Sequence, residues 1–388
     1  MKQITALLLF LASYGHAQVQ LSEKAEISVL TLGPWQGGVF TAFGHSAFLV
    51  RDPANGIDAA YNYGVFDFNP PIFYLNFARG HNLYKLGVMD YRNFEYSYIY
   101  FNRYIHQQVL NLRPEEKQKL FDFLQWNALP ENQEYLYDYF YDNCATKIPE
   151  VMLTVFGDSI VFDGSYITTR HSFRELTDIY LKEQPWGDLG IDVGLGLPTD
   201  KIATPYEYMF LPDFVESGFA HASIFRGGKS EPLVRETHVI YESTPEYYSP
   251  DLSHPLVVFS FFLVIAMLIS YYDQRRRKLS MIFDGIVFGV VGFLGVCLVL
   301  LWTATNHQAA AKNFNLIWAL PTHLIAVIAF IRQPKWLKTY FLITLVLCGI
   351  LLISWPLLPQ KLHYTLIPFV VALGLRSYIQ YRVRKQVG

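Results

Sequence analysis

The chain has 388 residues and a formal net charge of −2, because 31 Lys and Arg nearly balance 33 Asp and Glu. No basic block lies outside the loops that flank apolar segments, so the sequence gives no indication of nucleic-acid binding. Composition changes along the chain: residues up to about 250 are mixed and rich in aromatic side chains, whereas the remainder is nearly continuous apolar sequence. This division predicts two or three structural units.

The N-terminus has the features of a cleavable export signal. Lys2 gives it a positive start, residues 4–11 are apolar, and a small-x-Ala cleavage site ends at Ala17. The apolar stretch is too short to cross a bilayer. We therefore expect residues 1–17 to be removed and residues 18–250 to form a domain outside the cytoplasm.

A β-hairpin is expected early in this exported domain. Residues 41–50 alternate apolar and polar side chains, a turn-rich segment follows, and residues 59–64 form the returning strand. His45 would lie at the open end of the hairpin, where Asn62, or alternatively Asp67, can orient its ring. A histidine in a strand is on its own more often structural than catalytic.

Cys144 is the only cysteine of the expected exported domain, since Cys297 and Cys348 fall within apolar segments. It has no partner for an intramolecular disulfide, although an exported domain meets an oxidising compartment. A leftover thiol of this kind is either reactive or buried and inert.

The residues around Cys144 favour the reactive alternative. The aromatic run 135–141 predicts a strand or buried extended segment, and Asp142 or Asn143 is a good N-cap for a following helix. Cys144 would then lie in the first helical turn, where unpaired N–H groups and the helix dipole favour the thiolate. Pro149 predicts a kink, or a second helix that begins there.

A thiolate catalyst needs a side chain that is both base and acid near neutral pH, which is a property of histidine. His45 is the best candidate, and the remaining exported histidines have no comparable surroundings and are interpreted as surface or structural residues: His81, His106, His171 and His221. The sequence has no HExxH motif and no Cys/His cluster with ligand spacing, so neither a metal nor a cofactor is expected.

Residues 251–388 are predicted to form an all-α membrane domain. Hydropathy gives five transmembrane helices, at residues 256–272, 281–302, 316–331, 339–358 and 362–379. Lys and Arg gather in the first loop, the third loop and the C-terminal tail, which places these three segments in the cytoplasm and the large domain outside. His323 lies within the third span, where an ionisable group is a functional candidate, here for substrate binding, although a structural histidine fits as well.

Several motifs of the exported domain together resemble one known family. They are Gly44-His45-Ser46-Ala47-Phe48, Tyr61-Asn62-Tyr63-Gly64-Val65-Phe66-Asp67-Phe68, Leu110-Asn111-Leu112 before Pro114, Asp142-Asn143-Cys144-Ala145-Thr146-Lys147, Pro185-Trp186, Leu189-Gly190-Ile191-Asp192 and Met209-Phe210-Leu211-Pro212. The set resembles the N-terminal periplasmic domain of the Bacteroidota lipoprotein N-acyltransferases of the Lnb type, over about residues 27–225. The His-before-Cys order is also similar to the permuted NlpC/P60 and lecithin:retinol acyltransferase-like enzymes.

The resemblance implies an α+β periplasmic domain, papain-like and of the permuted NlpC/P60 type, followed by a five-helix bundle in the inner membrane. It implies that Cys144 takes an acyl chain from a membrane phospholipid as a thioester and passes it to the α-amine of a diacylated lipoprotein. His45 and Asn62 would assist, with the oxyanion held by the backbone N–H of Cys144 and of a neighbour. Asp67, Asp142, Asn143 and His323 are expected near the substrates.

Two other classes of function stay open at this stage. A membrane-tethered cysteine hydrolase, acting on peptidoglycan peptides or lipid esters, would use the same Cys144 and His45 with water as the acceptor. It predicts a polar, water-filled cleft, whereas a transferase predicts an apolar groove open to the bilayer. A non-catalytic envelope assembly protein predicts that Cys144 is dispensable.

Overall fold

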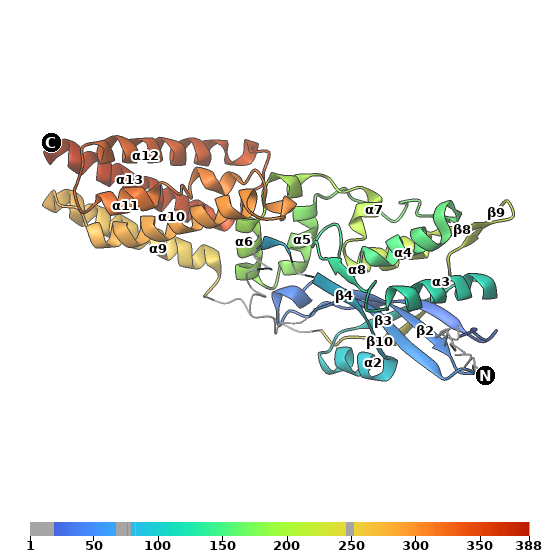
Figure 1. Ribbon diagram of the computed structural model, residues 1–388. Coiled ribbons are helices and arrows are strands. Elements are labelled where there is room, and N and C mark those ends of the chain that lie inside the picture. Colours follow the sequence, from blue (N-terminus) through green and yellow to red (C-terminus); the bar gives the residue numbers. More distant parts are fainter. Residues whose placement is uncertain (1–18, 67–75, 77–78, 82, 246–251, 388) are drawn as a thin grey trace, which may run out of the picture.

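The computed structural model describes residues 19–66, 76, 79–81, 83–245 and 252–387. Within these residues the chain forms an N-terminal domain of helices and strands and an elongated C-terminal helical bundle joined end to end (Figure 1). The expected export signal, residues 1–17, and Asp67 lie outside the described residues.

The N-terminal domain is built on a seven-stranded sheet in the order β10-β5-β1-β2-β3-β4-β6, in which every neighbouring pair is antiparallel. Residues 26–65 form the centre of the sheet, as one strand followed by a hairpin. Successive side chains of a strand point to opposite faces, so these strands can be covered on both faces. The strands are β1 (Glu26–Leu32), β2 (His45–Asp52), β3 (Ile57–Val65), β4 (Leu83–Asp90), β5 (Ile105–Leu110), β6 (Glu134–Leu136) and β10 (Val234–Tyr241).

Helices cover both faces of this sheet (Figure 1). One face packs on three helices: α3 (Pro114–Asn127), α4 (Lys147–Phe156) and α8 (Pro212–His221). The other face packs on α2 (Tyr91–Tyr100), through Tyr91, Phe94 and Tyr98. Successive residues of β2 pack on opposite faces of the sheet: Phe48 packs on the face covered by α3, α4 and α8, and Leu49 on the face covered by α2.

The remaining elements of this domain lie toward the bundle or at the far end of the sheet. Two helices lie between the sheet and the bundle, α5 (Phe173–Leu181) and α6 (Pro185–Gly194), and the short α7 (Pro205–Tyr208) lies beside α8. A small sheet consists of β7 (Ile160–Val161), β8 (Ser223–Arg226) and β9 (Lys229–Pro232).

Two predicted strands are shorter than the sequence indicated. The first hairpin strand begins at His45 rather than at residue 41, because residues 39–41 form a 3-10 turn. The strand expected over 135–141 ends at Leu136. The Asp138 carboxylate accepts the backbone N–H groups of Phe140 and Tyr141, at 2.9 and 3.0 Å, and so bends the chain into a turn.

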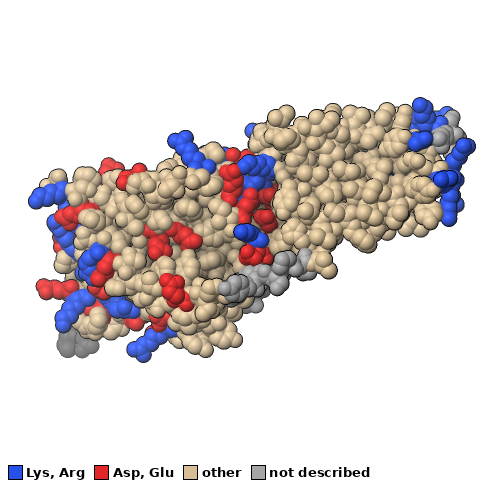
Figure 2. All heavy atoms as spheres, turned by 180° about the vertical axis from the view of Figure 1, so that it is seen from behind, with Lys and Arg blue, Asp and Glu red and all other residues tan. Residues whose placement is uncertain are grey.

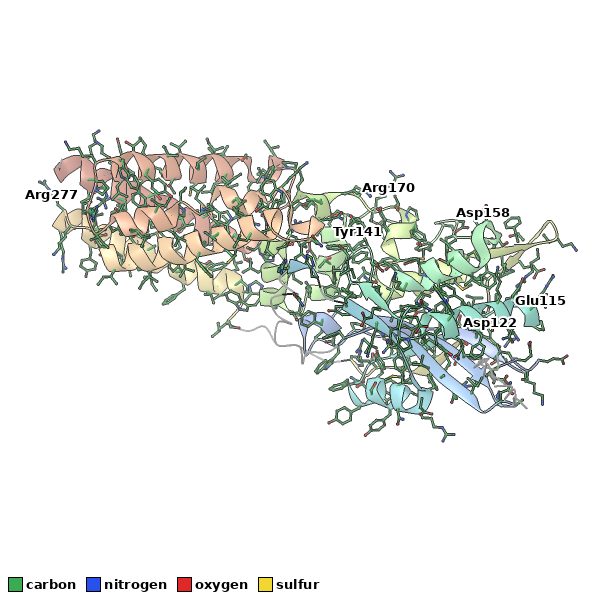
Figure 3. The ribbon with its side chains drawn as sticks, viewed as in Figure 1. Glu115, Asp122, Tyr141, Asp158, Arg170 and Arg277 are labelled. Carbon is green, nitrogen blue, oxygen red and sulfur yellow. The ribbon has the colours of Figure 1, made fainter. Side chains whose placement is uncertain are left out.

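The C-terminal bundle contains five helices among the described residues: α9 (Pro255–Arg276), α10 (Met281–Thr303), α11 (His323–Ala329), α12 (Trp336–Ser354) and α13 (Ile367–Val387). Figure 2 shows that the visible side of the bundle carries no charged side chains along its length and that Lys and Arg gather at its free end. Arg277 lies at that end, far from the N-terminal domain (Figure 3). Such a charge-free band ending in cations is what a membrane-spanning bundle requires.

Three of these helices are long and apolar enough to cross a membrane: Pro255–Arg276, Met281–Thr303 and Trp336–Leu357. The third predicted span is broken, because the 3-10 turn Phe314–Ile317 is followed by Pro321 and then by the seven-residue α11. The fifth, α13, has 21 residues but buries Arg376 and Gln380. Five spans therefore remain a prediction, with three supported by helix length and composition.

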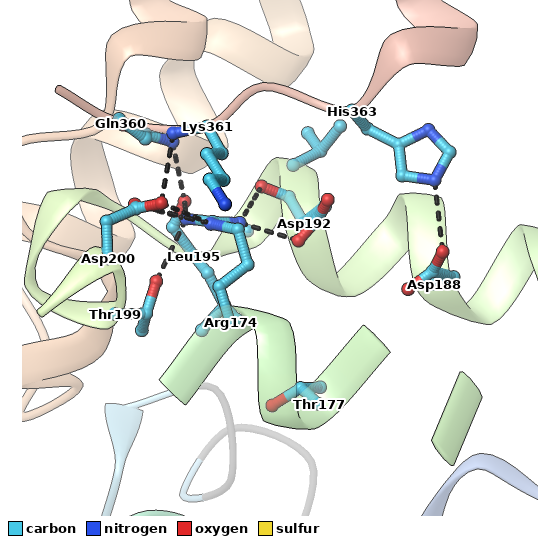
Figure 4. Close-up of polar contacts among 12 residues, drawn as sticks. Arg174, Thr177, Asp188, Asp192, Leu195, Thr199, Asp200, Gln360, Lys361 and His363 are labelled. Atoms are coloured by element: carbon cyan, nitrogen blue, oxygen red, sulfur yellow. Dashed lines mark hydrogen bonds and ion pairs between the residues drawn. The ribbon is translucent and has the colours of Figure 1, made fainter. Parts of the chain in front are cut away.

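A polar network joins the two domains (Figure 4). The buried Arg174 of α5 bonds Asp192 at 2.6 Å and Asp200 at 3.1 Å, and Asp200 also accepts the backbone N–H of Lys361 at 3.0 Å. Two further bonds cross the joint: Gln360 Nε2 donates to the carbonyl of Leu195, and His363 Nε2 bonds Asp188. Hydrogen bonds to buried charged groups are among the stronger ones, so this joint holds the N-terminal domain firmly on the bundle.

Candidate active site

Local backbone geometry places His45 at the first position of β2. The preceding Gly44 has φ +80°, and a Cβ there would lie 2.7 Å from the Leu32 carbonyl oxygen. Only glycine fits this left-handed turn without strain. His45 then pairs with Leu32 in the β1–β2 ladder, which fixes its backbone at the edge of the packed core.

Asn143 holds the turn that carries Cys144. Its Oδ1 accepts the N–H groups of Ala145 and Thr146, at 2.7 and 2.9 Å, and its Nδ2 donates to the carbonyls of Tyr139 and Phe210, at 2.7 and 2.9 Å. The sequence predicted Asp142 or Asn143 as the N-cap, with Cys144 in the first helical turn. Helix α4 instead begins at Lys147 after the N-cap Thr146, so Cys144 lies in the preceding turn, which the Asn143 side chain holds.

Pro149 does not kink the helix that follows. Helix α4 begins at Lys147, so the proline lies in the first turn, where its missing N–H would have had no acceptor within the helix. The structure is thus close to the second of the two alternatives that the sequence left open, with the start of the helix two residues earlier.

The structure brings Cys144, His45 and Asn62 together. His45 Nε2 lies 2.5 Å from Asn62 Oδ1. A carbonyl oxygen only accepts, so Nε2–H is the donor, and Nδ1 is left for the Cys144 thiol, with which the ring is hydrogen-bonded. In the antiparallel β2–β3 pair Phe48 lies opposite Tyr61. One residue further along, this register puts Asn62 opposite Ala47, from where its side chain reaches His45 diagonally.

The dyad shifts both of its own pKa values. Burial alone would raise the pKa of the Cys144 thiol, but the adjacent His45, together with the N–H groups of Ser46 and Ala145, lowers it below its usual value. Burial alone would lower the pKa of His45, but the thiolate and the bond to Asn62 raise it. Both shifts favour the thiolate–imidazolium pair, which is the nucleophilic form of a cysteine–histidine dyad.

Gly64 leaves an open space beside the dyad. It has φ +87°, and a Cβ built on it would lie 3.4 Å from Cys144 Cβ, 3.9 Å from His45 Cε1 and 3.9 Å from the Tyr135 hydroxyl. The glycine therefore leaves room for about one atom at the point where the two reacting side chains and Tyr135 meet.

Tyrosines surround the thiol. Burial raises the pKa of five of them, and the charge of Cys144 raises it further: Tyr84, Tyr98, Tyr135, Tyr137 and Tyr139. The site is thus rich in phenol groups that keep their protons.

Arg103 is a charged neighbour that sequence reasoning missed. Its guanidinium is 8% exposed, bonds the Gly33 carbonyl at 2.6 Å and lies 4.4 Å from the centre of the Tyr98 ring, which stacks on His45. Burial lowers the pKa of Arg103, while the charge of Cys144 acts to raise it. Arg103 is the only charged residue between Tyr96 and Ile105. Arginine is rarely buried without a partner, so a single cation in an aromatic run could have identified this residue from the sequence.

The other sequence-predicted site residues lie in three different settings. Asp142 pairs with Lys147 at 2.7 Å, and both ends of the Asn143 amide bond the backbone, so these two side chains hold the cysteine turn. His323 lies inside the bundle, where Nδ1 bonds the Tyr340 hydroxyl at 2.7 Å and Nε2 bonds the Trp318 carbonyl at 3.2 Å. Asp67 falls outside the described residues.

Two cavities lie where the domains meet. One of about 450 Å³ is lined by charged and histidine side chains, among them Asp178, Lys182, His254 and His363. The other, of about 180 Å³, is largely apolar, and both domains contribute to it: Phe140, Tyr141, Phe173, Pro198 and Thr199 from one, Gln308 and Ala309 from the other. Phe140 and Tyr141 belong to the segment that precedes Cys144 in the chain.

No group of three or more His, Cys, Asp or Glu side chains among the described residues is arranged to hold a metal ion.

Comparison with known proteins gives two matches, both to domains of one family. The Lnb N-terminal periplasmic domain matches residues 12–173, and the Lnb transmembrane domain matches residues 248–386. No curated protein and no solved structure matches the chain. The first match contains Cys144, His45 and Asn62, and the second contains the whole helical bundle.

Proposed function

The chain belongs to the Lnb family, a membrane protein with a periplasmic domain, and we propose that it is a lipoprotein N-acyltransferase of the inner membrane. Family membership indicates a membrane enzyme that modifies lipoproteins. The observation that carries the finer proposal is the half-buried Cys144–His45–Asn62 arrangement in a domain docked on the bundle.

The reaction has two halves. The Cys144 thiolate attacks the carbonyl carbon of a phospholipid ester, and the ester C–O bond breaks as the leaving alkoxide takes the proton of His45. The products are an acyl-thioester and a lysophospholipid. The α-amine of a diacylated lipoprotein then attacks the thioester, its proton passes to His45, and the thiolate is restored. An α-amine has a pKa near 7.7–8.0, so much of it is a free nucleophile at neutral pH.

A transferase must keep water from the thioester until the amine arrives. The tyrosines around Cys144 and their burial support this requirement. The apolar cavity of about 180 Å³ supports it as well, since its lining joins Phe140 and Tyr141, from the segment before Cys144, to residues of the membrane domain, from which an acyl chain would come.

The charge distribution supports the proposed orientation. Arg275, Arg276 and Arg277 end α9 at the free end of the bundle, while the opposite end meets the N-terminal domain (Figures 2 and 3). Cations favour the cytoplasmic side. A reporter fused after Gly388 should therefore show cytoplasmic activity, and periplasmic phosphatase activity there would contradict the topology.

The decisive experiment has two steps. Purified protein in phosphatidylethanolamine vesicles should gain one acyl mass on Cys144, and a synthetic diacylated lipopeptide should remove that mass and gain it as an amide. In cells, loss of the protein should leave lipoproteins with two chains and a free N-terminus, and its return should give three. Identical N-terminal peptides with and without the protein would refute the proposal.

A cysteine hydrolase would give a different result in the same experiment. Water would release free fatty acid or peptide at the same rate with and without an amine acceptor. A non-catalytic assembly protein would gain no acyl mass, and its Cys144→Ser variant would be fully functional.

A further inference from the structure

We infer that the Tyr135 hydroxyl is a catalytic donor, which with the backbone N–H of Cys144 holds the oxyanion formed when the thiolate attacks an ester. The inference deepens the proposed function and rests on it for the identity of the natural ester. It adds a residue that sequence reasoning did not single out as a catalytic group.

Acyl transfer requires two donors directed at the developing oxyanion, and the cysteine turn supplies one. The backbone N–H of Cys144 donates to no residue among those described. The next two N–H groups, of Ala145 and Thr146, already donate to Asn143 Oδ1. The expectation that a neighbouring N–H supplies the second donor therefore does not fit this turn, and another group is needed.

The Tyr135 hydroxyl is buried and has no hydrogen-bond partner within the described structure. A buried unpaired hydroxyl is destabilising, so a protein retains one mainly where something else will bind it. Burial raises the pKa of Tyr135 far above its usual value, so its hydroxyl keeps the proton and remains a donor.

The ring that carries this hydroxyl is held firmly. Tyr135 pairs with Tyr84 in the sheet, its ring meets Tyr63 edge-on at 6.2 Å, and the Lys147 ammonium lies 4.8 Å from the ring centre. A donor that is fixed before the reaction needs no reorganisation when charge develops, which is the condition for strong oxyanion stabilisation.

The hydroxyl faces the reacting atoms across the space that Gly64 leaves open. That space lies 3.4 Å from Cys144 Cβ and 3.9 Å from the Tyr135 oxygen, and it holds about one atom. The hydrogen bonds that lower the pKa of Cys144 come from His45, Ser46 and Ala145, so the resting thiolate does not use the phenol. The tyrosine hydroxyl is therefore available to the oxygen of an attacked carbonyl, which in the tetrahedral intermediate carries the negative charge.

The test is Tyr135→Phe in the full-length protein, with Cys144 acylation followed by intact mass in phosphatidylethanolamine vesicles and, separately, with p-nitrophenyl butyrate. Loss of one oxyanion donor should slow acylation by about 10²–10³-fold. Alkylation of Cys144 by iodoacetamide, which forms no oxyanion, should keep its wild-type rate. The unfolding midpoint should not fall, since the hydroxyl has no partner to lose.

Tyr63→Phe is the matched control. The Tyr63 hydroxyl donates to Asn127 Oδ1 at 2.5 Å, outside the reacting centre. This variant should lose stability and keep acylation within about twofold, the opposite of Tyr135→Phe. If Tyr135→Phe acylates within about twofold of wild type, or if acylation and alkylation slow together, the inference is overturned.

A second pair of variants decides the question if Tyr135→Phe does not fold. Gly64→Ala fills the space between the hydroxyl and Cys144, whereas Gly56→Ala imposes a similar positive-φ strain, φ +66° against +87°, with no atom within 4 Å. Only Gly64→Ala should abolish acylation, and an active Gly64→Ala would overturn the inference.

The two acyl donors, phospholipid and p-nitrophenyl butyrate, distinguish a failure of this inference from a failure of the proposed function. A wild-type protein acylated by p-nitrophenyl butyrate but not by the phospholipid would refute the proposed donor, and Tyr135→Phe would still be expected to slow the nitrophenyl ester. Equal acylation rates of wild type and Tyr135→Phe with both acyl donors would refute the role of Tyr135 as an oxyanion donor and leave the transferase proposal intact.

Discussion

Two clusters of buried polar groups lie in the two domains, and they differ in how completely their atoms are paired. In the bundle, Arg376 bonds Asp284 at 2.7 and 2.8 Å, Asp273 at 2.6 Å and Ser270 at 3.0 Å, and Gln380 adds a bond to Asp284 at 2.5 Å. Around Cys144, by contrast, the Tyr135 hydroxyl is unpaired, and the Cys144 N–H has no acceptor among the described residues.

This difference separates a structural cluster from a reactive one. The Arg376 cluster ties α9, α10 and α13 together, and each of its charged groups has an ion-pair partner within the protein, as a low-dielectric interior demands. The Cys144 site keeps groups that only a substrate can satisfy. Substitutions should therefore affect stability in the first cluster and activity in the second.

The largest effect is expected at the dyad. Cys144→Ser and His45→Ala should each reduce acyl transfer by at least about 10³-fold, and the double variant should be no worse than either, because the two residues act as one unit. Intact mass after incubation with phospholipid measures the adduct. Thermal unfolding should stay near wild type, and a wild-type rate in Cys144→Ser would end its assignment as nucleophile.

The reverse pattern is expected for Arg376→Ala. It leaves two buried carboxylates without their cation and should cost about 3–5 kcal/mol of stability. The transfer rate per folded molecule should be unchanged. Arg382→Ala, an exposed arginine of the same helix, is the control and should leave the unfolding midpoint unchanged. A loss of activity in folded Arg376→Ala would show that the cluster is coupled to the site.

Asn62→Ala should have an intermediate effect and reduce the rate of acyl transfer about tenfold. Asn62 only orients the general acid and base, so its loss should remove a small part of what general acid–base catalysis contributes. The hydrogen bond that His45 donates to Asn62 helps to raise the pKa of His45, so its removal lowers that pKa. The imidazolium then deprotonates earlier, and the alkaline limb of the rate profile should move to lower pH. Full activity with an unchanged profile would transfer the orienting role to Asp67 or to another residue.

The smallest effect is expected at Asp178, which tests whether an unpaired buried group must be functional. Burial and the nearby Asp192 and Asp188 raise its pKa to about 8, and its Oδ1 has no partner. The folded state thus holds a proton that the unfolded chain releases, so stability should fall as pH rises from about 4 to 8. Asp178→Asn should remove that slope, raise the unfolding midpoint slightly at pH 8, and leave the transfer rate unchanged. A lost transfer rate would assign Asp178 to the site.

The two members of the proposed dyad could be picked out from the sequence because each has a local signal. One is the single cysteine of the expected exported domain, which follows Asn143, and the other is a histidine in an alternating strand. Family resemblance added the link between them, and the structure places them in contact. The break in the third predicted span could not be predicted from hydropathy. The hydropathy of a window is an average that includes Pro321, so it does not show that the helix is interrupted there.

By itself the sequence predicted the division into a mixed N-terminal domain and an apolar bundle, and a hairpin that carries His45, because composition and alternation are patterns of neighbouring residues. Only the tertiary structure decided which groups surround the thiol. Arg103, Tyr135 and Gly64 come from separate elements, and no pattern of spacing shows that they converge. Whether their polar atoms are paired depends on the packing of the whole domain, and that packing distinguishes a reactive cluster from a structural one.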